Sequence, residues 1–146
     1  MNFLYNVYNN LQKMKIIYTD GSCLKNPGGA GGWAICLIKD NGREYLISEG
    51  NPHTTNNRME LQAIIEAVSC VEENEECLIY SDSQLSINCC DGKWKRKANL
   101  DLWKEYDNKS VNKKIRFKWV KAHNGDKYNE IVDKLARSEA KKMNFK

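Results

Sequence analysis

The way the strand-like segments are connected is the feature of this sequence that most constrains its fold. Two strand-like runs, Trp33–Lys39 and Glu44–Ser48, flank Asp40-Asn41-Gly42, and an Asn-Gly pair between such runs is a strong hairpin signal. Later strand-like runs alternate with segments of helical periodicity, an order that implies right-handed crossovers between parallel strands. A hairpin followed by helix-alternated strands predicts an α/β domain with one mixed sheet.

Apolar spacing gives the expected elements. Leu61, Ile64, Ile65 and Val68 recur at helical spacing behind Asn57, which predicts a helix that begins there. We expect strands at 15–19, 33–39, 44–48, 77–81 and 115–121, and helices at 57–71, 83–90, 100–107 and 129–143. The predicted fold class is therefore α/β, with a mixed five-stranded sheet flanked by helices.

Length and composition limit the architecture and the class of partner. A chain of 146 residues fits one domain, which we assign to residues 14–146. Residues 1–13 are Asn-rich with one basic residue, and we expect them to form a frayed or locally packed N-terminal extension, with Met14 as an alternative start. A net charge of +4 favours a polyanionic partner without establishing one.

The cysteines and the apolar runs indicate where in the cell the protein works. The six cysteines lie mostly inside apolar runs or at turns, without zinc spacing and without a secretory signal before them. Reduced thiols in an intracellular protein are the better interpretation. No apolar run is long enough to span a membrane, so no membrane association is expected.

Four carboxylates stand at places where the chain changes direction or begins a helix: Asp20, Glu60, Asp82 and Asp133. Each has an ordinary explanation. Asp20 suits a turn, and Asp82 suits a helix cap. Glu60 follows Asn57 by three residues, the spacing of a capping box, and Asp133 can pair with Arg137 four residues later.

Together the four carboxylates indicate a metal site. Strand ends and helix starts converge in an α/β domain, and clustered carboxylates repel each other unless a cation or a raised pKa relieves them. Oxygen ligands without Cys-His pairs favour Mg²⁺ or Mn²⁺ over zinc. Two such ions in one site suit phosphodiester cleavage, so a nuclease is the first hypothesis.

Several longer motifs carry a resemblance to a known family. They are Tyr18-Thr19-Asp20-Gly21-Ser22-Cys23, Asn26-Pro27-Gly28, Thr54-Thr55-Asn56-Asn57-Arg58-Met59-Glu60-Leu61, Ser81-Asp82-Ser83-Gln84 and Val120-Lys121-Ala122-His123-Asn124-Gly125. In this order they resemble the signature segments of type 1 ribonuclease H, from about Met14 to the end of the chain. The resemblance implies the ribonuclease H-like fold.

The resemblance also implies an activity and its catalytic residues. The four carboxylates would hold two Mg²⁺ ions, with Mn²⁺ as a possible substitute. The enzyme would hydrolyse the RNA strand of an RNA/DNA hybrid and leave 5′-phosphate and 3′-hydroxyl ends. His123 would assist water activation or product release, although a solvated loop residue is its ordinary interpretation. Glu130 matches an acidic residue of the family that helps metal traffic and product release. Its ordinary interpretation is a glutamate in the first turn of a helix, which is favourable there without any catalytic role.

The same resemblance implies two sets of hybrid contacts. The matching residues for the RNA strand are Ser22, Cys23, Asn26, Asn56, Asn57 and Gln84, whose ordinary roles are turn formation and helix capping. The DNA-strand phosphate pocket matches Thr55 and Asn99. There His53 stands where many relatives carry arginine, so we expect a weaker and more pH-sensitive phosphate contact.

The largest departure from the family lies between Cys90 and Leu100, where many relatives carry an extra helix and basic loop. Only Gly92-Lys93-Trp94-Lys95-Arg96-Lys97 remains here. These residues form either a phosphate- and base-contacting segment or a solvated charged loop. We expect lower hybrid affinity, strong salt dependence and no separate hybrid-binding domain.

Two alternatives compete with this interpretation. A transposase or integrase core would lack the block that ends in Arg58-Met59-Glu60 and would need further DNA-binding domains. A hybrid-binding module that has lost catalysis would lack one of the carboxylates. We therefore expect an enzyme that acts as a monomer with an RNA/DNA hybrid as its partner.

Overall fold

The computed structural model describes residues 14–144. The expected extension at residues 1–13 lies outside the described residues. The elements, in chain order, are β1 (Lys15–Cys23), β2 (Gly31–Ile38), β3 (Glu44–Asn51), α2 (Asn56–Ser69), β4 (Glu76–Ser81), α3 (Gln84–Cys90), α4 (Leu100–Ser110), β5 (Lys114–Trp119) and α5 (Lys127–Met143).

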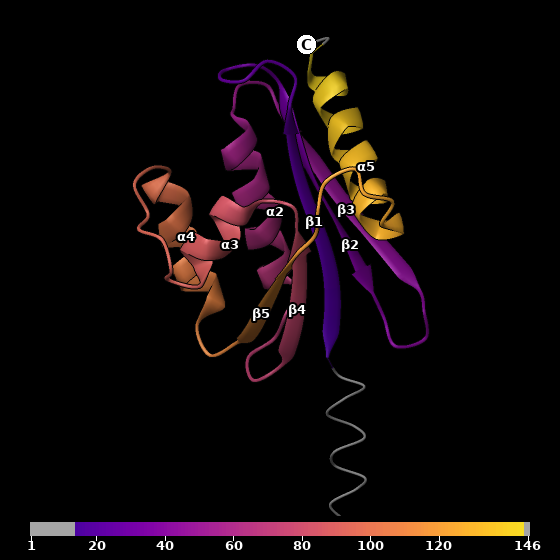
Figure 1. The fold of residues 1–146 in the computed structure, drawn as a ribbon, viewed down its shortest axis with the longest axis vertical. Helices are drawn as coiled ribbons and strands as arrows, with labels where there is room; N and C mark the ends of the chain where they lie inside the picture. Colours follow the sequence, from indigo (N-terminus) through magenta and orange to yellow (C-terminus); the bar gives the residue numbers. More distant parts are fainter. Residues whose placement is uncertain (1–13, 145–146) are drawn as a thin grey trace, which may run out of the picture.

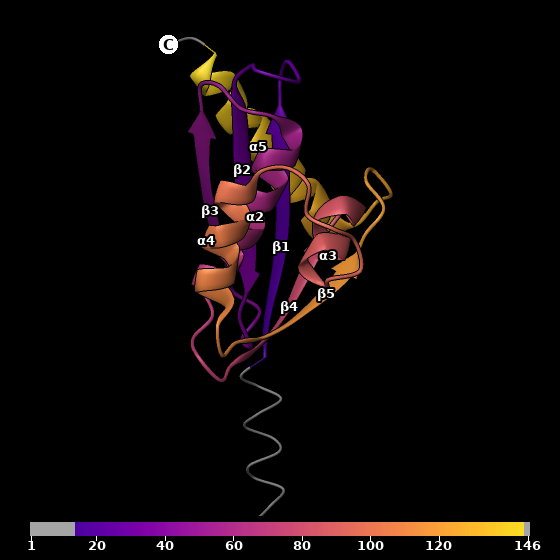
Figure 2. The same ribbon diagram turned by 90° about the vertical axis from the view of Figure 1, so that its left-hand side faces the viewer.

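The strands form one mixed sheet with the order β3-β2-β1-β4-β5. The Asn-Gly hairpin joins β2 to β3, and β1 pairs antiparallel with β2. β4 pairs parallel with both β1 and β5. Helices α2, α3 and α4 lie on one face of the sheet, and α5 lies on the other, against β1, β2 and β3 (Figures 1 and 2). The predicted α/β class and mixed five-stranded sheet are confirmed.

Two apolar layers hold the sheet between its helices. Ile17, Ile35 and Ile79 pack toward α2, whereas Tyr18 and Cys36, one residue further along their strands, pack toward α5. Successive side chains of a strand point to opposite faces, so β2 is buried on both sides along nearly its whole length. The layers fix β1 at the centre of the molecule, and β1 carries Asp20.

Three boundaries differ from the sequence prediction in ways that affect the site. β1 continues through Cys23, because Asp20 to Cys23 pair with Ala34 to Gly31 of β2; Asp20 is therefore a strand residue and not a turn residue. The N-cap of α2 is Thr55 rather than Asn57. α5 begins two residues early, at Lys127, because Asp126 accepts hydrogen bonds from the N–H groups of Tyr128 and Asn129.

The cysteines are unpaired, as the sequence predicts. All six cysteines are free, and Cys36, Cys77 and Cys89 are buried. Within residues 14–144, no helix has both the length and the apolar character needed to cross a bilayer.

Candidate metal centre and nucleic-acid interface

Three of the four predicted carboxylates meet at one edge of the sheet. Asp20 comes from β1, Glu60 from α2, and Asp82 follows the last residue of β4. One carboxylate oxygen from each lies within 4.8 Å of the others. β1 and β4 run parallel as neighbours, so their carboxyl ends reach the same edge, and only 3% of Asp20 and 8% of Glu60 is exposed.

Glycine at position 21 permits Glu60 to approach β1. A Cβ at Gly21 would lie 2.2 Å from the backbone nitrogen of Glu60, closer than such atoms can stand. The N–H of Gly21 donates to Oε1 of Glu60 at 2.5 Å. The ordinary alternative for Glu60, a capping box with Asn57, is therefore excluded, because the Glu60 side chain bonds β1 instead of its own helix start.

Burial dominates the ionisation of this cluster. Burial raises the pKa of Asp20 from 3.8 to about 7; a hydrogen bond with Glu60 opposes the rise, and the charges of Asp82 and Asp133 add to it. The pKa of Glu60 is raised well above its usual value, first by burial and then by the adjacent Asp20 carboxyl. Two such neighbours hold a shared proton unless a cation is present.

The donor set fits a divalent cation. Oε2 of Glu60 is buried and has no hydrogen-bond partner in the described part of the chain. A cation bound between the carboxylates would satisfy it. Carboxylate oxygens are the ligands that Mg²⁺ and Mn²⁺ prefer, and the cluster contains no cysteine or histidine.

Asp133 lies beside this cluster and is not one of its three members. Its Oδ2 forms an ion pair with Nη2 of Arg137 at 3.0 Å, as its ordinary explanation supposed, and lies 4.0 Å from Nδ1 of His123. His123 is exposed in the loop between β5 and α5, and Glu130 is exposed in the first turn of α5. The structure thus places Asp133 and His123 next to each other, beside the Asp20, Glu60 and Asp82 cluster but not within it.

Asp82 has a different neighbour from the one expected of a helix cap. Ser83 is the N-cap of α3, and its hydroxyl accepts from the N–H of Ser86. The indole Nε1 of Trp119 donates to the backbone carbonyl of Asp82 at 3.1 Å, so the end of β5 holds the chain at Asp82. Nothing in the sequence pattern indicates this contact of Trp119.

The residues predicted for the RNA strand lie around the start of α2. Oδ1 of Asn26 accepts from the N–H of Asn56 at 3.1 Å, and the Cys23 thiol donates to the carbonyl of Lys25 at 3.1 Å. Ser22 and Cys23 end β1, Asn57 is exposed near the start of α2, and Gln84 is exposed as the first residue of α3. Asn26 and Asn56 therefore have the structural roles expected of loop and helix-start residues, next to the carboxylate edge.

The residues predicted for the DNA phosphate are connected through Arg58. The Thr55 hydroxyl accepts from the N–H of Arg58 at 3.1 Å, and Oδ1 of Asn99 accepts from its Nη1 at 3.3 Å. Arg58 also makes a bidentate pair with Asp101 at 3.0 and 2.8 Å. His53 lies at the other side, with Nδ1 3.4 Å from the carbonyl of Gly28. No sequence pattern indicates the link from Arg58 to Asp101, because the two residues lie 43 positions apart in different helices.

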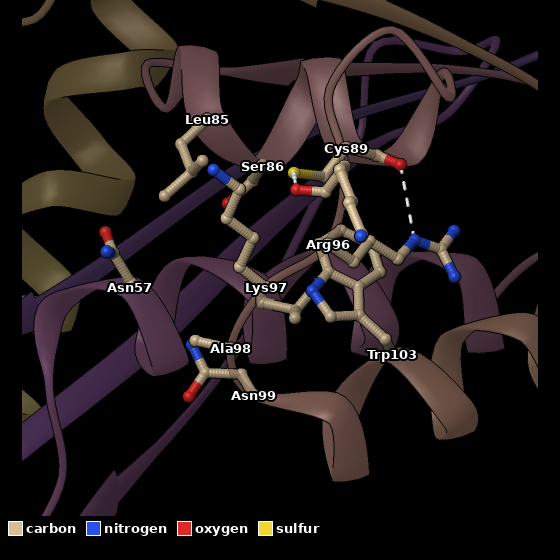
Figure 3. A pocket seen from close by; sticks show the side chains of 11 residues that line it. Asn57, Leu85, Ser86, Cys89, Arg96, Lys97, Ala98, Asn99 and Trp103 are labelled. Carbon is tan, nitrogen blue, oxygen red and sulfur yellow. Dashed lines mark hydrogen bonds between the residues drawn. The ribbon is translucent and has the colours of Figure 1, made fainter.

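A pocket of about 160 Å³ joins this region to the basic segment 92–97 (Figure 3). Its lining includes Asn57, Lys95, Lys97 and Asn99. Arg96 is not available for phosphate: it bonds both oxygens of Asp107 at 2.8 Å and stacks over Trp103 at 4.2 Å. The cations of this segment that remain exposed are Lys93, Lys95 and Lys97, beside the exposed ring of Trp94.

Most of the chain is similar to known ribonuclease H sequences. A model of the RNase H family matches residues 12–141. The ribonuclease H of Campylobacter jejuni strain 81-176 is 49% identical over 136 residues, covering 87% of this chain and 91% of that protein. The ribonuclease H of Wolbachia pipientis wMel is 44% identical over 140 residues, covering 86% and 94%.

A solved structure agrees at the level of the fold. LC11-RNase H1, determined in complex with an RNA/DNA hybrid, superposes with a TM-score of 0.77 at 22% identity, covering 88% of this chain and 97% of that one. The N-terminal RNase H domain of Rv2228c from Mycobacterium tuberculosis gives a TM-score of 0.76 at 21% identity, covering 89% and 95%. The resemblance stated from the motifs is confirmed.

Proposed function

The chain belongs to the ribonuclease H family, and on that premise we propose that it hydrolyses the RNA strand of RNA/DNA hybrids with two divalent ions, leaving 5′-phosphate and 3′-hydroxyl ends. The observation that carries the proposal is the convergence of Asp20, Glu60 and Asp82, with oxygens within 4.8 Å of one another. No structural purpose requires three acids there, and the raised pKa values of Asp20 and Glu60 show that their burial costs free energy.

The residues divide the work of the reaction. Asp20, Glu60 and Asp82 would hold Mg²⁺, with Asp133 completing the site from α5 and Mn²⁺ as a possible substitute. When bound, the ions lower the pKa of the attacking water and offset charge on the leaving 3′ oxygen. His123, exposed 4.0 Å from Asp133, is placed to accept a proton from that water or to assist release of the product.

The polar groups beside the carboxylates would distinguish the two strands. Ser22, Cys23, Asn26, Asn56, Asn57 and Gln84 would contact the RNA strand, where a 2′-hydroxyl can both donate and accept. Thr55, Asn99 and His53 would hold a phosphate of the DNA strand. The hybrid bound by LC11-RNase H1, a protein of the same fold, supports this choice of substrate, and we propose that one chain acts as a monomer.

Cleavage of an end-labelled RNA strand tests the proposal. The strand is presented alone, paired with RNA and paired with DNA, each with Mg²⁺ or with chelator, for the wild type and Asp82→Asn. We expect metal-dependent cutting in the DNA-paired case alone, lost in Asp82→Asn, with products that carry a 5′-phosphate. Hybrid that is bound but never cut would contradict the proposal.

A further inference from the structure

Arg58 makes more contacts than an exposed surface arginine needs. Its guanidinium spans from α2 to the start of α4, with two hydrogen bonds to Asp101 and one to Asn99. The hydrogen bonds with Arg58 lower the pKa of Asp101 to about 2, so this carboxylate stays ionised at any working pH. The fork geometry of a bidentate pair fixes the guanidinium plane.

The contact with Asn99 determines which way its amide faces. Arginine carries N–H donors and no acceptor, so only the oxygen of the Asn99 amide can lie 3.3 Å from Nη1. The amide nitrogen, with its two N–H groups, must then point away from Arg58. Figure 3 shows this nitrogen turned toward the other residues of the pocket and the oxygen turned away from them.

The Asn99 side chain does not cap its own helix. Asn99 is the N-cap residue of α4, with a left-handed φ of 57°, and its side chain makes no capping hydrogen bond. Asparagine tolerates this backbone conformation better than most residues do. The backbone conformation alone does not require the hydrogen bond between the Asn99 side chain and Arg58. In the described chain, Arg58 is the residue that makes a side-chain hydrogen bond to the Asn99 amide.

We propose that Arg58 is a positioning residue for the DNA strand: with Asp101 as its anchor, it turns the N–H groups of Asn99 toward a backbone phosphate. The inference rests on the proposed function, because it deepens the role proposed there for Thr55, Asn99 and His53 at a DNA phosphate. The backbone N–H of residue 58 donates to the Thr55 hydroxyl at 3.1 Å, the N-cap bond of α2, so Thr55 and Arg58 lie in the same first turn of that helix. The guanidinium itself stays paired with Asp101 and does not touch the phosphate.

The chain offers a matched control on the same helix. Asp107 also pairs with an arginine, because both of its oxygens accept from Nη1 of Arg96 at 2.8 Å. Arg96 has two further contacts that do not involve Asp107, its bond to the Cys89 carbonyl and its stacking on Trp103. Asp101→Asn and Asp107→Asn thus remove the same charge, and each weakens one aspartate–arginine ion pair, although only Asp101 engages both terminal nitrogens of its arginine. Only the first loosens a side chain that holds Asn99.

The proposal is tested with three single variants, Arg58→Lys, Asp101→Asn and Asp107→Asn. Each is made alone and in combination with Asn99→Ala. Lysine keeps the charge and loses the fork, so general attraction to the hybrid is preserved. The readouts are KM, kcat and the hybrid Kd measured in Ca²⁺. We expect Arg58→Lys to raise KM and Kd about tenfold with kcat nearly unchanged, Asp101→Asn to act in the same direction, and Asp107→Asn to leave all three values alone.

The double-mutant cycle decides between positioning and a merely structural role. If Arg58 acts through Asn99, Arg58→Lys has little further effect once Asn99→Ala is present. The same insensitivity is expected when the DNA strand carries neutral methylphosphonate linkages. Additive effects of Arg58→Lys and Asn99→Ala, or equal effects of Asp101→Asn and Asp107→Asn, would overturn the inference. A wild type that binds hybrid without cutting it would defeat the proposed function, while the Kd cycle would still test Arg58.

Discussion

Asp20 is the residue whose environment gives the sharpest expectation. Its folded pKa, about 7 against an ordinary 3.8, means that the folded protein binds a proton more tightly than the unfolded chain does. Stability therefore falls as pH rises from about 4 to about 7. In chelator, Asp20→Asn should reduce that slope to the part that the raised pKa of Glu60 contributes, and it should stabilise the protein at pH 8 by about 2 kcal/mol, measured by urea unfolding. A slope equal to that of the wild type would contradict the assignment.

Gly21 supports a second prediction at this scale. A methyl group at position 21 would overlap the backbone of Met59 and Glu60, so β1 and α2 must separate to admit it. Gly21→Ala should cost about 3 kcal/mol in the free energy of unfolding and reduce kcat by more than tenfold, since Glu60 moves with its helix. Gly42→Ala is the control: no atom lies within 4 Å of the added Cβ, and its left-handed φ of 81° costs stability in the β2–β3 hairpin without moving Glu60. Equal kcat values for the two variants would be the contrary result.

At the scale of elements, segment 92–97 determines how strongly salt weakens hybrid binding. Lys93, Lys95 and Lys97 are its exposed cations, and each phosphate contact contributes about 0.9 to the slope of log K against log salt. Replacing all three lysines with alanine should flatten that slope by about 2.7 if each contacts a phosphate, and it should weaken binding at low salt. The measurement is a salt titration of the hybrid Kd.

A triple variant with the same change in charge serves as the control. Lys39, Arg43 and Lys114 lie at or beyond the ends of β2, β3 and β5 that are farthest along their strands from the carboxylate edge. Alanine at these three positions should leave the slope within about 0.5 of the wild type. If both triple variants flatten the slope equally, net charge and not the segment controls binding.

Helices and strands could be predicted from the sequence where residues close together in the chain determine them, through apolar periodicity or turn-forming residues. The Asn-Gly hairpin and the apolar stripe of α2 both occur as expected. Element ends depended on partners distant in sequence: β1 runs on through Asp20 because β2 lies beside it. The four carboxylates were found from their places at strand and helix ends, whereas the bond from Trp119 to Asp82 and the link from Arg58 to Asn99 arise only when separate elements pack.

At the scale of the whole molecule, the candidate metal site draws on most of the fold. Its carboxylates come from β1, α2 and the end of β4, with Asp133 on α5 beside them. Global unfolding separates all of these elements, so a cation that binds here binds the folded state alone. Metal binding must therefore stabilise the entire domain and not only a local loop.

Thermal unfolding in Mg²⁺ measures this coupling. At an ion concentration about ten times its Kd, the free energy of unfolding should rise by about 1.4 kcal/mol, which raises Tm by about 3 °C for a chain of this size. The increase should be smaller at pH 5 than at pH 8, because burial raises the pKa of Asp20 to about 7 and protons compete with the cation. KCl of equal ionic strength controls for screening, and Asp20→Asn should abolish the increase. An equal rise in that variant would place the stabilising ion elsewhere on the molecule.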